Sequence, residues 1–405
     1  MIVEGKEYNL EDMSIDDIKL LKEKLIISKN KKNQLQLGLK IQMNSIYGAF
    51  CHPAFLCFNP DIAESITVQG QDLVKFGEKI LDHYFHNIWE SEVSLHKDEI
   101  LKCENAMNTR ESMIIYTDTD SNFLCLEEWF KLNYPGITDY KVKRNMILRL
   151  FELRLTKYIQ ECFEKYAKKF NVNNGQDFEL EAIFDCGILL VKKRYVMSTI
   201  WKMPNIMMEP LQSLKIIGVD IVRKNVPRYV GEKLKDFVKY ILIKGNNLSL
   251  QDIIKKVKEF KKEYELQDIK DISFYTGIND LNKYVLSDKE KLILNSKCPP
   301  QHKAAGIYNH LLYQNPNLNI KYQRIQSNNK IYWYYIKYDS KKSLVNKKEE
   351  ETFAFPVDKF PNEFAPEIDL DRMFNVCFVK PLNKFVEVIT GSKIPEKLVY
   401  QRKLF

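Results

Sequence analysis

Two carboxylates, Asp118 and Asp120, stand close together in the segment Y-T-D-T-D-S of residues 116–121. This polar segment lies between two strand-like runs, so it predicts a hairpin whose turn projects both acids from a rigid ribbon. Oxygen ligands of this kind suit Mg²⁺, which usually takes one or two carboxylates and completes its shell with water and phosphates. The alternative is an ordinary Asp- and Thr-rich surface turn, and the segment alone does not decide between them.

A second polar group, Lys40, Asn44 and Tyr47, belongs to the segment K-I-Q-M-N-S-I-Y-G of residues 40–48. On a helix that advances about 100° per residue, the three side chains fall within about 60° of one another. A cation, an amide and a phenol on one face could hold a triphosphate and a base. The alternative is a solvated lysine and a tyrosine packed at a helix end.

A long helical pattern positions this second group. It begins at Ser14, a plausible N-cap with Asp17 as its acidic partner three residues later. Apolar residues then recur at steps of three and four, with a Lys- and Asn-rich interruption between residues 28 and 33. Further helices are predicted over 62–84, 142–170, 228–244 and 249–264, a strand region over 183–200, and surface loops at 246–247 and 340–351.

Taken together, these segments resemble family B DNA polymerases. Residues 40–48 are similar to the K-x-x-x-N-S-x-Y-G motif of the family, and residues 116–121 to its Y-G-D-T-D-S motif, with Thr117 in place of the glycine. Residues 192–195, K-K-R-Y, follow in the family's order. The resemblance to the polymerases of T-even-like phages continues through residues 61–67, 215–218, 298–302 and 378–382.

One part of the family pattern is missing. Nothing before Lys40 matches the D-x-x-S-L-Y-P-S motif that carries the first metal-binding aspartate, and the exonuclease and N-terminal domains would precede Met1. Because the chain opens with methionine and ends in a family-like tail, we expect the C-terminal subunit of a split polymerase. A non-catalytic DNA-binding or scaffold subunit of a replication complex is the alternative, although a scaffold does not need the retained acids.

The resemblance implies a fold and its domains. We expect an α+β fold with the second half of the fingers at 1–50, a palm of antiparallel sheet and helices at 51–218, and a helical thumb with a C-terminal tail at 219–405. The reaction would be two-metal phosphoryl transfer to a primer 3′-hydroxyl.

The resemblance also implies roles in catalysis and nucleotide binding. Asp120 would bridge two Mg²⁺ ions shared with the partner chain, with Asp118 beside it. Lys40 would bind the triphosphate of the incoming deoxynucleotide, Asn44 would orient it, and Tyr47 would lie under the nascent base pair. Two acids on the segment before the predicted strand region, Glu179 and Glu181, match acidic positions near the active site, unless they are simply solvated.

Contacts to primer–template DNA are expected from basic residues. If residues 192–195 alternate along a strand, Lys193 and Tyr195 face one way, and Lys192 and Arg194 the other. By the family's pattern Lys193 would reach the minor groove and Tyr195 would support the primer, whereas a cationic edge strand is the alternative. Further candidates for phosphate contacts are Lys215, Arg223, Lys224 and His302.

The end of the chain resembles a short tail that docks on a sliding clamp, with Leu404 and Phe405 as its apolar pair. A frayed terminus is the alternative.

Composition agrees with this reading. The chain has 405 residues, 45% of them hydrophobic, and a formal net charge of +8, a modest basic excess that suits a phosphate-binding surface. Its eight cysteines form no C-x-x-C pair, so we expect reduced thiols. No apolar run approaches the ~20 residues of a membrane span, and we expect a cytoplasmic protein, in the infected host cell if it is viral.

Overall fold

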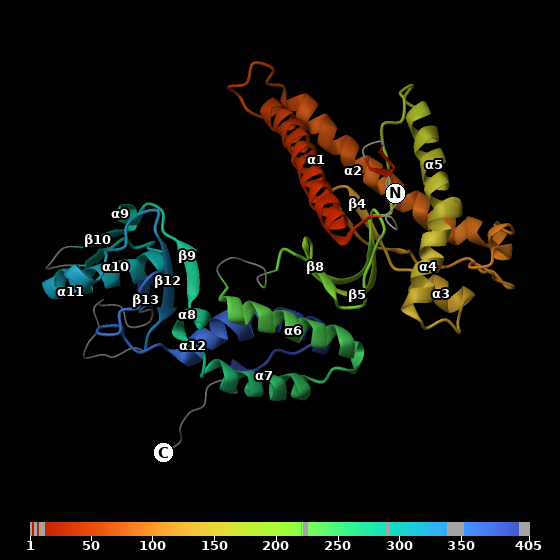
Figure 1. The fold of residues 1–405 in the computed structure, drawn as a ribbon. Coiled ribbons are helices and arrows are strands. Elements are labelled where there is room, and N and C mark those ends of the chain that lie inside the picture. The colour runs from red at the N-terminus through yellow and green to blue at the C-terminus, as the bar shows by residue number, and fades with distance from the viewer. Residues whose placement is uncertain are drawn as a thin grey trace. The chain divides into compact units, whose positions relative to one another are not determined.

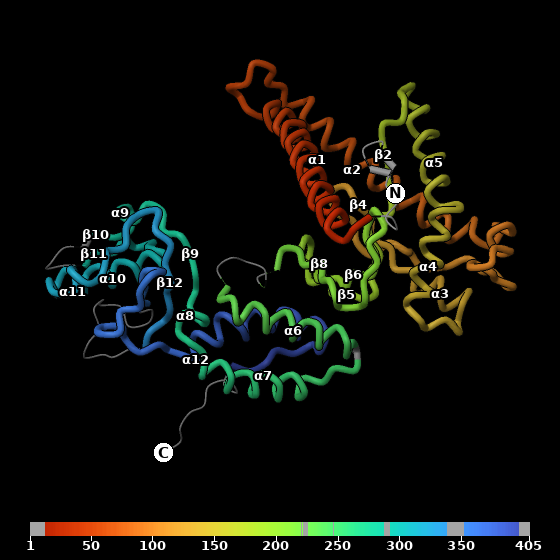
Figure 2. The backbone as a smooth tube through the Cα atoms, viewed as in Figure 1, coloured from red at the N-terminus to blue at the C-terminus, as the bar shows by residue number. Residues whose placement is uncertain are grey.

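The structure, a computed structural model, describes residues 2–3, 6–7, 13–219, 221, 226–287, 292–337 and 352–396. The chain divides into two compact units, one formed by residues 1–138 and 145–178 and the other by residues 139–144 and 179–405. Figure 2 traces the backbone of both. Among the described residues, no helix is long and apolar enough to cross a membrane.

The first unit is mainly helical. A long helix, α1, runs beside α2, and a hairpin of β3 and β4 packs near α2 (Figure 1). Its helices and strands are β1 (Ile2–Val3), β2 (Lys6–Glu7), α1 (Ile15–Phe50), α2 (Pro60–His83), β3 (Ile114–Asp118), β4 (Ser121–Leu124), α3 (Glu127–Asn133), α4 (Tyr140–Leu150, whose first five residues cluster with the second unit) and α5 (Thr156–Lys168). Single π-helical turns follow α2 and α4, over Tyr84–Ile88 and Phe151–Leu155.

The core of the first unit is aromatic and is organised by one buried amide. Trp89 and Trp129 are fully buried with ring centroids 5.0 Å apart. The Asn133 side chain accepts hydrogen bonds from Trp89 Nε1 at 3.0 Å and from the Met107 amide at 2.8 Å, and it donates to the Met107 carbonyl at 3.1 Å. It also donates to the Trp129 carbonyl at 3.0 Å, so this amide holds the segment before β3 against α3 at full hydrogen-bonding capacity.

The second unit contains small antiparallel sheets and the remaining helices. Its elements are β5 (Ala182–Val191), β6 (Arg194–Lys202), β7 (Ile206–Met207), β8 (Ser213–Ile217), α6 (Arg228–Lys244), α7 (Leu250–Tyr264), α8 (Ile269–Ile272), β9 (Phe274–Gly277), α9 (Leu281–Tyr284), β10 (Val285–Ser287), β11 (Leu292–Leu294), α10 (Pro300–Gln314), α11 (Pro316–Lys321), β12 (Lys330–Tyr335), β13 (Thr352–Pro356), α12 (Leu370–Phe374) and α13 (Lys380–Thr390). The strand β6 pairs with β5, β7 and β8, and β12 pairs with β9 and β13. All described pairings are antiparallel, so the expected α+β fold is confirmed.

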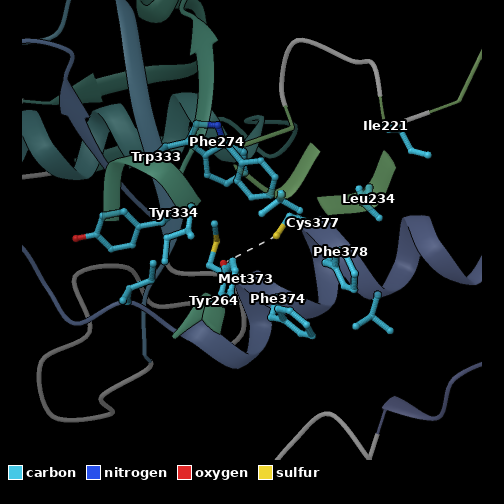
Figure 3. Packing of buried hydrophobic residues seen from close by; sticks show 14 of the residues in the cluster. Ile221, Leu234, Tyr264, Phe274, Trp333, Tyr334, Met373, Phe374, Cys377 and Phe378 are labelled. Atoms are coloured by element: carbon cyan, nitrogen blue, oxygen red, sulfur yellow. Dashed lines mark hydrogen bonds between the residues drawn. The ribbon is translucent and has the colours of Figure 1, made fainter. Parts of the chain in front are cut away.

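One hydrophobic core joins the β5–β8 sheet to the helices that follow it. Its cluster extends from Ile188 and Val196 on the sheet to Phe374 and Phe378 near α12. Figure 3 shows the part around Tyr264, whose hydroxyl lies 3.9 Å from the Cys377 sulfur, and burial raises the pKa of this thiol to about 12. The two compact units divide mainly at 178/179, whereas the palm and thumb are predicted to divide at 218/219, and the predicted domains stay a prediction.

Several local predictions are confirmed. Ser14 caps α1 and accepts a hydrogen bond from the Asp17 amide at 3.2 Å. The helix predicted over 249–264 is α7, and α6 has the predicted bounds. All eight cysteines are free thiols. The long helix predicted to begin at Ser14 is also confirmed, because α1 continues without a break through the Lys- and Asn-rich residues 28–33, whose lysines are good helix formers. The predicted loop at 340–351 lies outside the described residues.

Candidate active site

The two acids of the Y-T-D-T-D-S segment lie at the tip of a tight hairpin. Asp118 pairs with Ser121 across the β3–β4 ladder, which leaves Thr119 and Asp120 as the two turn residues. Thr119 adopts a left-handed φ of 53°, and the Asp120 amide donates to the Asp118 carbonyl oxygen at 2.6 Å. The predicted hairpin is confirmed, and the turn brings both carboxylates to the same end of the ribbon.

The surroundings of the two carboxylates suit a divalent cation. Asp118 is half-buried and Asp120 is exposed. Thr119 Oγ1 donates to the Asp118 carboxylate at 3.1 Å, and Ser121 Oγ donates to the Asp118 carbonyl at 3.2 Å. Within the part of the chain that the structure describes, no group of three or more His, Cys, Asp or Glu residues could hold a metal. Two carboxylates are nevertheless the usual protein share of a Mg²⁺ shell, so this donor set fits the ion.

Helix α2 packs against the hairpin and accepts hydrogen bonds from it. The Asp82 carboxylate accepts hydrogen bonds from the Met113 amide at 2.8 Å and from Ser112 Oγ at 2.7 Å, at the start of β3. A Cβ atom at Gly77 would lie 2.8 Å from the side-chain amide of Asn122, so a larger residue there would require this side chain to shift where β4 meets α2. Asp82 was not among the predicted site residues, although its i, i+4 spacing from Glu78, which accepts a hydrogen bond from Thr117 of β3, places both acids on one face of α2.

The predicted nucleotide-binding residues lie on α1, in the same unit as the hairpin. Lys40, Asn44 and Tyr47 are all exposed, with Tyr47 at 37%, and their spacing places them on one helix face. Leu21 is the one residue of α1 that is buried.

The K-K-R-Y segment does not form one strand. Lys192 and Lys193 are the two turn residues between β5 and β6, and Lys193 has a left-handed φ of 62°. The predicted alternation of four residues is therefore wrong. Lys192, Lys193 and Arg194 are exposed at this turn, whereas Tyr195 is buried in the sheet at 6% exposure.

Four other predicted residues are placed by the structure. Lys215 Nζ lies 3.4 Å from Glu181 Oε1, so a predicted DNA-binding cation and a predicted acidic support form an ion pair. Glu179 is exposed. His302 is buried in α10, where its Nε2 lies 2.7 Å from the Asn279 carbonyl oxygen, and this burial removes its ring from the protein surface. Arg223, Lys224, Leu404 and Phe405 lie outside the described residues.

Comparison with known proteins matches the chain to a family model, "DNA polymerase family B", over residues 18–132 and 148–385. The chain belongs to this family. The matched ranges include the predicted nucleotide face, the Asp118–Asp120 hairpin and the K-K-R-Y turn.

Individual relatives agree with this membership. The chain is 24% identical over 265 residues to a "DNA-directed DNA polymerase" of Enterobacteria phage T4, an alignment that covers 62% of this chain and 27% of the relative. It is 27% identical over 213 residues to a "DNA polymerase catalytic subunit" of Human herpesvirus 8 type P, covering 51% of this chain and 17% of the relative. A "DNA-directed DNA polymerase" of Escherichia phage RB69 is 23% identical over 221 residues, covering 52% and 22%. The family B chain therefore spans about a quarter or less of the length of these relatives.

Proposed function

We propose that this chain supplies the palm, part of the fingers and the thumb of a DNA-directed DNA polymerase that adds deoxynucleotides to a primer 3′-hydroxyl. The observation that carries the proposal is the β3–β4 hairpin, which presents Asp118 and Asp120 at one tip. The hairpin belongs to the same compact unit as the helix that bears Lys40, Asn44 and Tyr47. Membership of family B supports the reaction class.

The two acids are the proposed metal ligands. Asp120, exposed at the turn, would hold Mg²⁺ together with an acid from outside this chain. Asp118 would add a second negative charge beside the metal. Mg²⁺, when bound as a pair of ions, stabilises the attacking and leaving oxygens of phosphoryl transfer. The role of the hairpin is to hold its carboxylate oxygens in a fixed direction, because the tight turn leaves little conformational freedom.

The α1 residues are the proposed nucleotide contacts. Lys40 would attract the triphosphate as a point charge and favour the pyrophosphate leaving group. Asn44 would orient the triphosphate through its amide. Tyr47 would contact the minor-groove edge of the new base pair, where correct pairs present similar acceptors.

The K-K-R-Y turn is the proposed contact with primer–template DNA. Three exposed cations at one hairpin tip provide positive charge that can bind backbone phosphates without reading sequence. The buried Tyr195 would stabilise the sheet beneath the turn rather than touch DNA directly. Lys215 is a weaker candidate because its charge is shared with Glu181.

A second polypeptide is proposed as the partner of α1. This helix exposes large apolar side chains along its length, including Ile15 at 74%, Leu35 at 66% and Met43 at 71%. A helix with apolar residues on several faces is normally buried against other parts of the protein or against a partner chain. The proposed partner carries the first fingers helix, the D-x-x-S-L-Y-P-S aspartate and the exonuclease domain, as in a split polymerase.

Primer extension tests this function. The chain and a polypeptide that carries the missing aspartate are assayed separately and together, with Mg²⁺, a labelled primer–template and four deoxynucleotides. We expect extension only from the mixture, together with co-elution of the two chains. Robust extension by this chain alone would contradict the need for a partner. A stable but inactive mixture that still binds DNA would instead favour the scaffold function.

A further inference from the structure

The hairpin carries a threonine, Thr117, directly before Asp118, at the position where the family motif has glycine. Its hydroxyl donates a hydrogen bond to the Glu78 carboxylate on α2, and it lies 3.3 Å from the Asn122 side-chain oxygen. A glycine offers no side chain for such a contact. The hydrogen bond between Thr117 and Glu78 is therefore a feature of this chain and not of the motif it resembles.

The register of the hairpin shows which face Thr117 occupies. Thr117 pairs with Asn122, and Asp118 pairs with Ser121. Successive side chains of a strand point to opposite faces, so the side chains of Thr117 and Asn122 share the face that contacts α2. The Asp118 side chain consequently projects to the other face of the same ribbon.

Helix α2 holds β3 at two places. Asp82 accepts hydrogen bonds from Ser112 and Met113, directly before the strand, and Glu78, one helical turn earlier, accepts from Thr117 near the end of the strand. Residues at i and i+4 lie on the same helix face. Asp82 therefore fixes the base of the hairpin, and Glu78 fixes the part that immediately precedes the two acids.

We propose that Thr117 and Glu78 are positioning residues, which hold the tip of the hairpin on α2 and so fix the direction of the Asp118 and Asp120 carboxylates. This inference rests on the proposed function. Without the hydrogen bond, the ribbon beyond Met113 can rotate or lift from α2, and the two carboxylates lose a common orientation. A misplacement of about 1 Å in a reacting group can cost about 100-fold in rate, so a partial loosening should be measurable.

Three matched variants test the proposal in the complex with the partner polypeptide. Thr117→Val keeps a similar shape and removes the hydroxyl, whereas Thr117→Ser keeps the hydroxyl. Thr67→Val makes the same change on α2, where the hydroxyl bonds only within its own helix, to the carbonyl oxygens of Ala63 at 2.8 Å and Glu64 at 2.9 Å. The readouts are the rate of nucleotide addition at varied Mg²⁺, the binding of Mn²⁺ followed by electron paramagnetic resonance, and the amide exchange of residues 113–125 without metal.

We expect Thr117→Val to lower kcat about tenfold, to raise the Mg²⁺ concentration for half-maximal rate and to weaken Mn²⁺ binding, with KM for deoxynucleotide within about twofold. Amide exchange should rise in the hairpin and stay unchanged in α6. Thr117→Ser and Thr67→Val should resemble the wild type. A combined Thr117→Val and Glu78→Ala variant should be no slower than the slower single variant, because both remove the same contact.

The proposal is overturned if folded Thr117→Val keeps wild-type Mg²⁺ dependence and hairpin exchange, or if Thr117→Ser is equally impaired. If Thr117→Val does not fold, Glu78→Gln weakens the same hydrogen bond by removing the charge of its acceptor. Wild-type Mg²⁺ dependence of Glu78→Gln would then overturn the proposal. Asp120→Asn separates the two proposals. If that variant stays active, the proposed metal site is wrong, whereas an inactive Asp120→Asn beside a normal Thr117→Val refutes only the positioning role.

Discussion

Gly218 stands where the end of β8 meets the K-K-R-Y turn, and replacing it by alanine should displace that turn. Gly218 has a left-handed φ of 66°, and a Cβ atom there would lie 2.0 Å from the Lys193 carbonyl oxygen. The left-handed conformation costs alanine about 1 kcal/mol. The overlap with backbone requires a shift of the turn or of β8, at about 1–3 kcal/mol. We therefore expect Gly218→Ala to lower the free energy of unfolding by about 2–4 kcal/mol.

The structure offers a matched control for this variant. Gly391 has a φ of 68°, and no atom lies within 4 Å of the Cβ that an alanine would add. Gly391→Ala should therefore show the conformational cost alone, about 1 kcal/mol. The difference between the two variants measures the contact with the Lys193 carbonyl.

Thermal unfolding and DNA binding check the prediction together. For a unit of this size, about 1 kcal/mol corresponds to about 2–4 °C, so Gly218→Ala should lower Tm by about 4–16 °C and Gly391→Ala by about 2–4 °C. Fluorescence anisotropy at fixed salt should show weaker primer–template binding for Gly218→Ala only. Equal losses of stability for the two variants would show that the contact with the Lys193 carbonyl costs nothing. Unchanged DNA binding by Gly218→Ala would show that the position of the K-K-R-Y turn does not matter for DNA.

Three further predictions concern separate parts of the chain. Lys40→Ala should raise KM for deoxynucleotide and leave primer–template affinity nearly unchanged in steady-state assays, because Lys40 is assigned to the triphosphate; equal losses would make it a DNA contact. The Arg149 guanidinium, with Nη2 2.9 Å from Asp98 Oδ2, holds the pKa of Asp98 below its usual range. That stabilisation is complete above the ordinary pKa of about 4 and is lost as pH falls through the lowered folded-state value. Asp98→Asn should thus lower Tm at pH 7, with a difference from wild type that shrinks below about pH 4, and a constant difference would contradict the assignment. Deletion of residues 401–405, which lie outside the described residues, should reduce clamp-stimulated synthesis on long templates but not synthesis on short primers, and an undiminished clamp response would make the tail a frayed end.

The elements with strong local signals were predictable from the sequence. Ser14 carries N-cap chemistry that acts over three residues, and the structure places α1 directly after it. The Asp118 hairpin followed from polar turn residues between two strand-like runs. Each of these predictions depends on contacts between residues close in the chain, which a sequence displays directly.

The errors arose where distant segments decide the structure. The K-K-R-Y segment contains no glycine, asparagine or aspartate to mark a turn, yet Lys193 takes a left-handed conformation beside Gly218, which follows β8. His302 reads as a polar surface residue, but the sheet and helices around α10 bury it. Glu181 and Lys215 looked like independent charges, and only the pairing of β5 with β6 and of β6 with β8 brings them together. None of these contacts produces a repeating pattern of residues from which the sequence could predict it.

The most direct test of the central claim is nucleotide addition by the Asp120→Asn variant, measured in the reconstituted complex with Mg²⁺ at saturating deoxynucleotide. The amide keeps the shape of the side chain but removes the charge that would hold the metal, so a group needed mainly in the transition state is lost. We expect turnover to be abolished while primer–template affinity, measured in parallel, stays within a few-fold of wild type. Turnover close to that of the wild-type complex would contradict the assignment of the hairpin as the metal-binding centre.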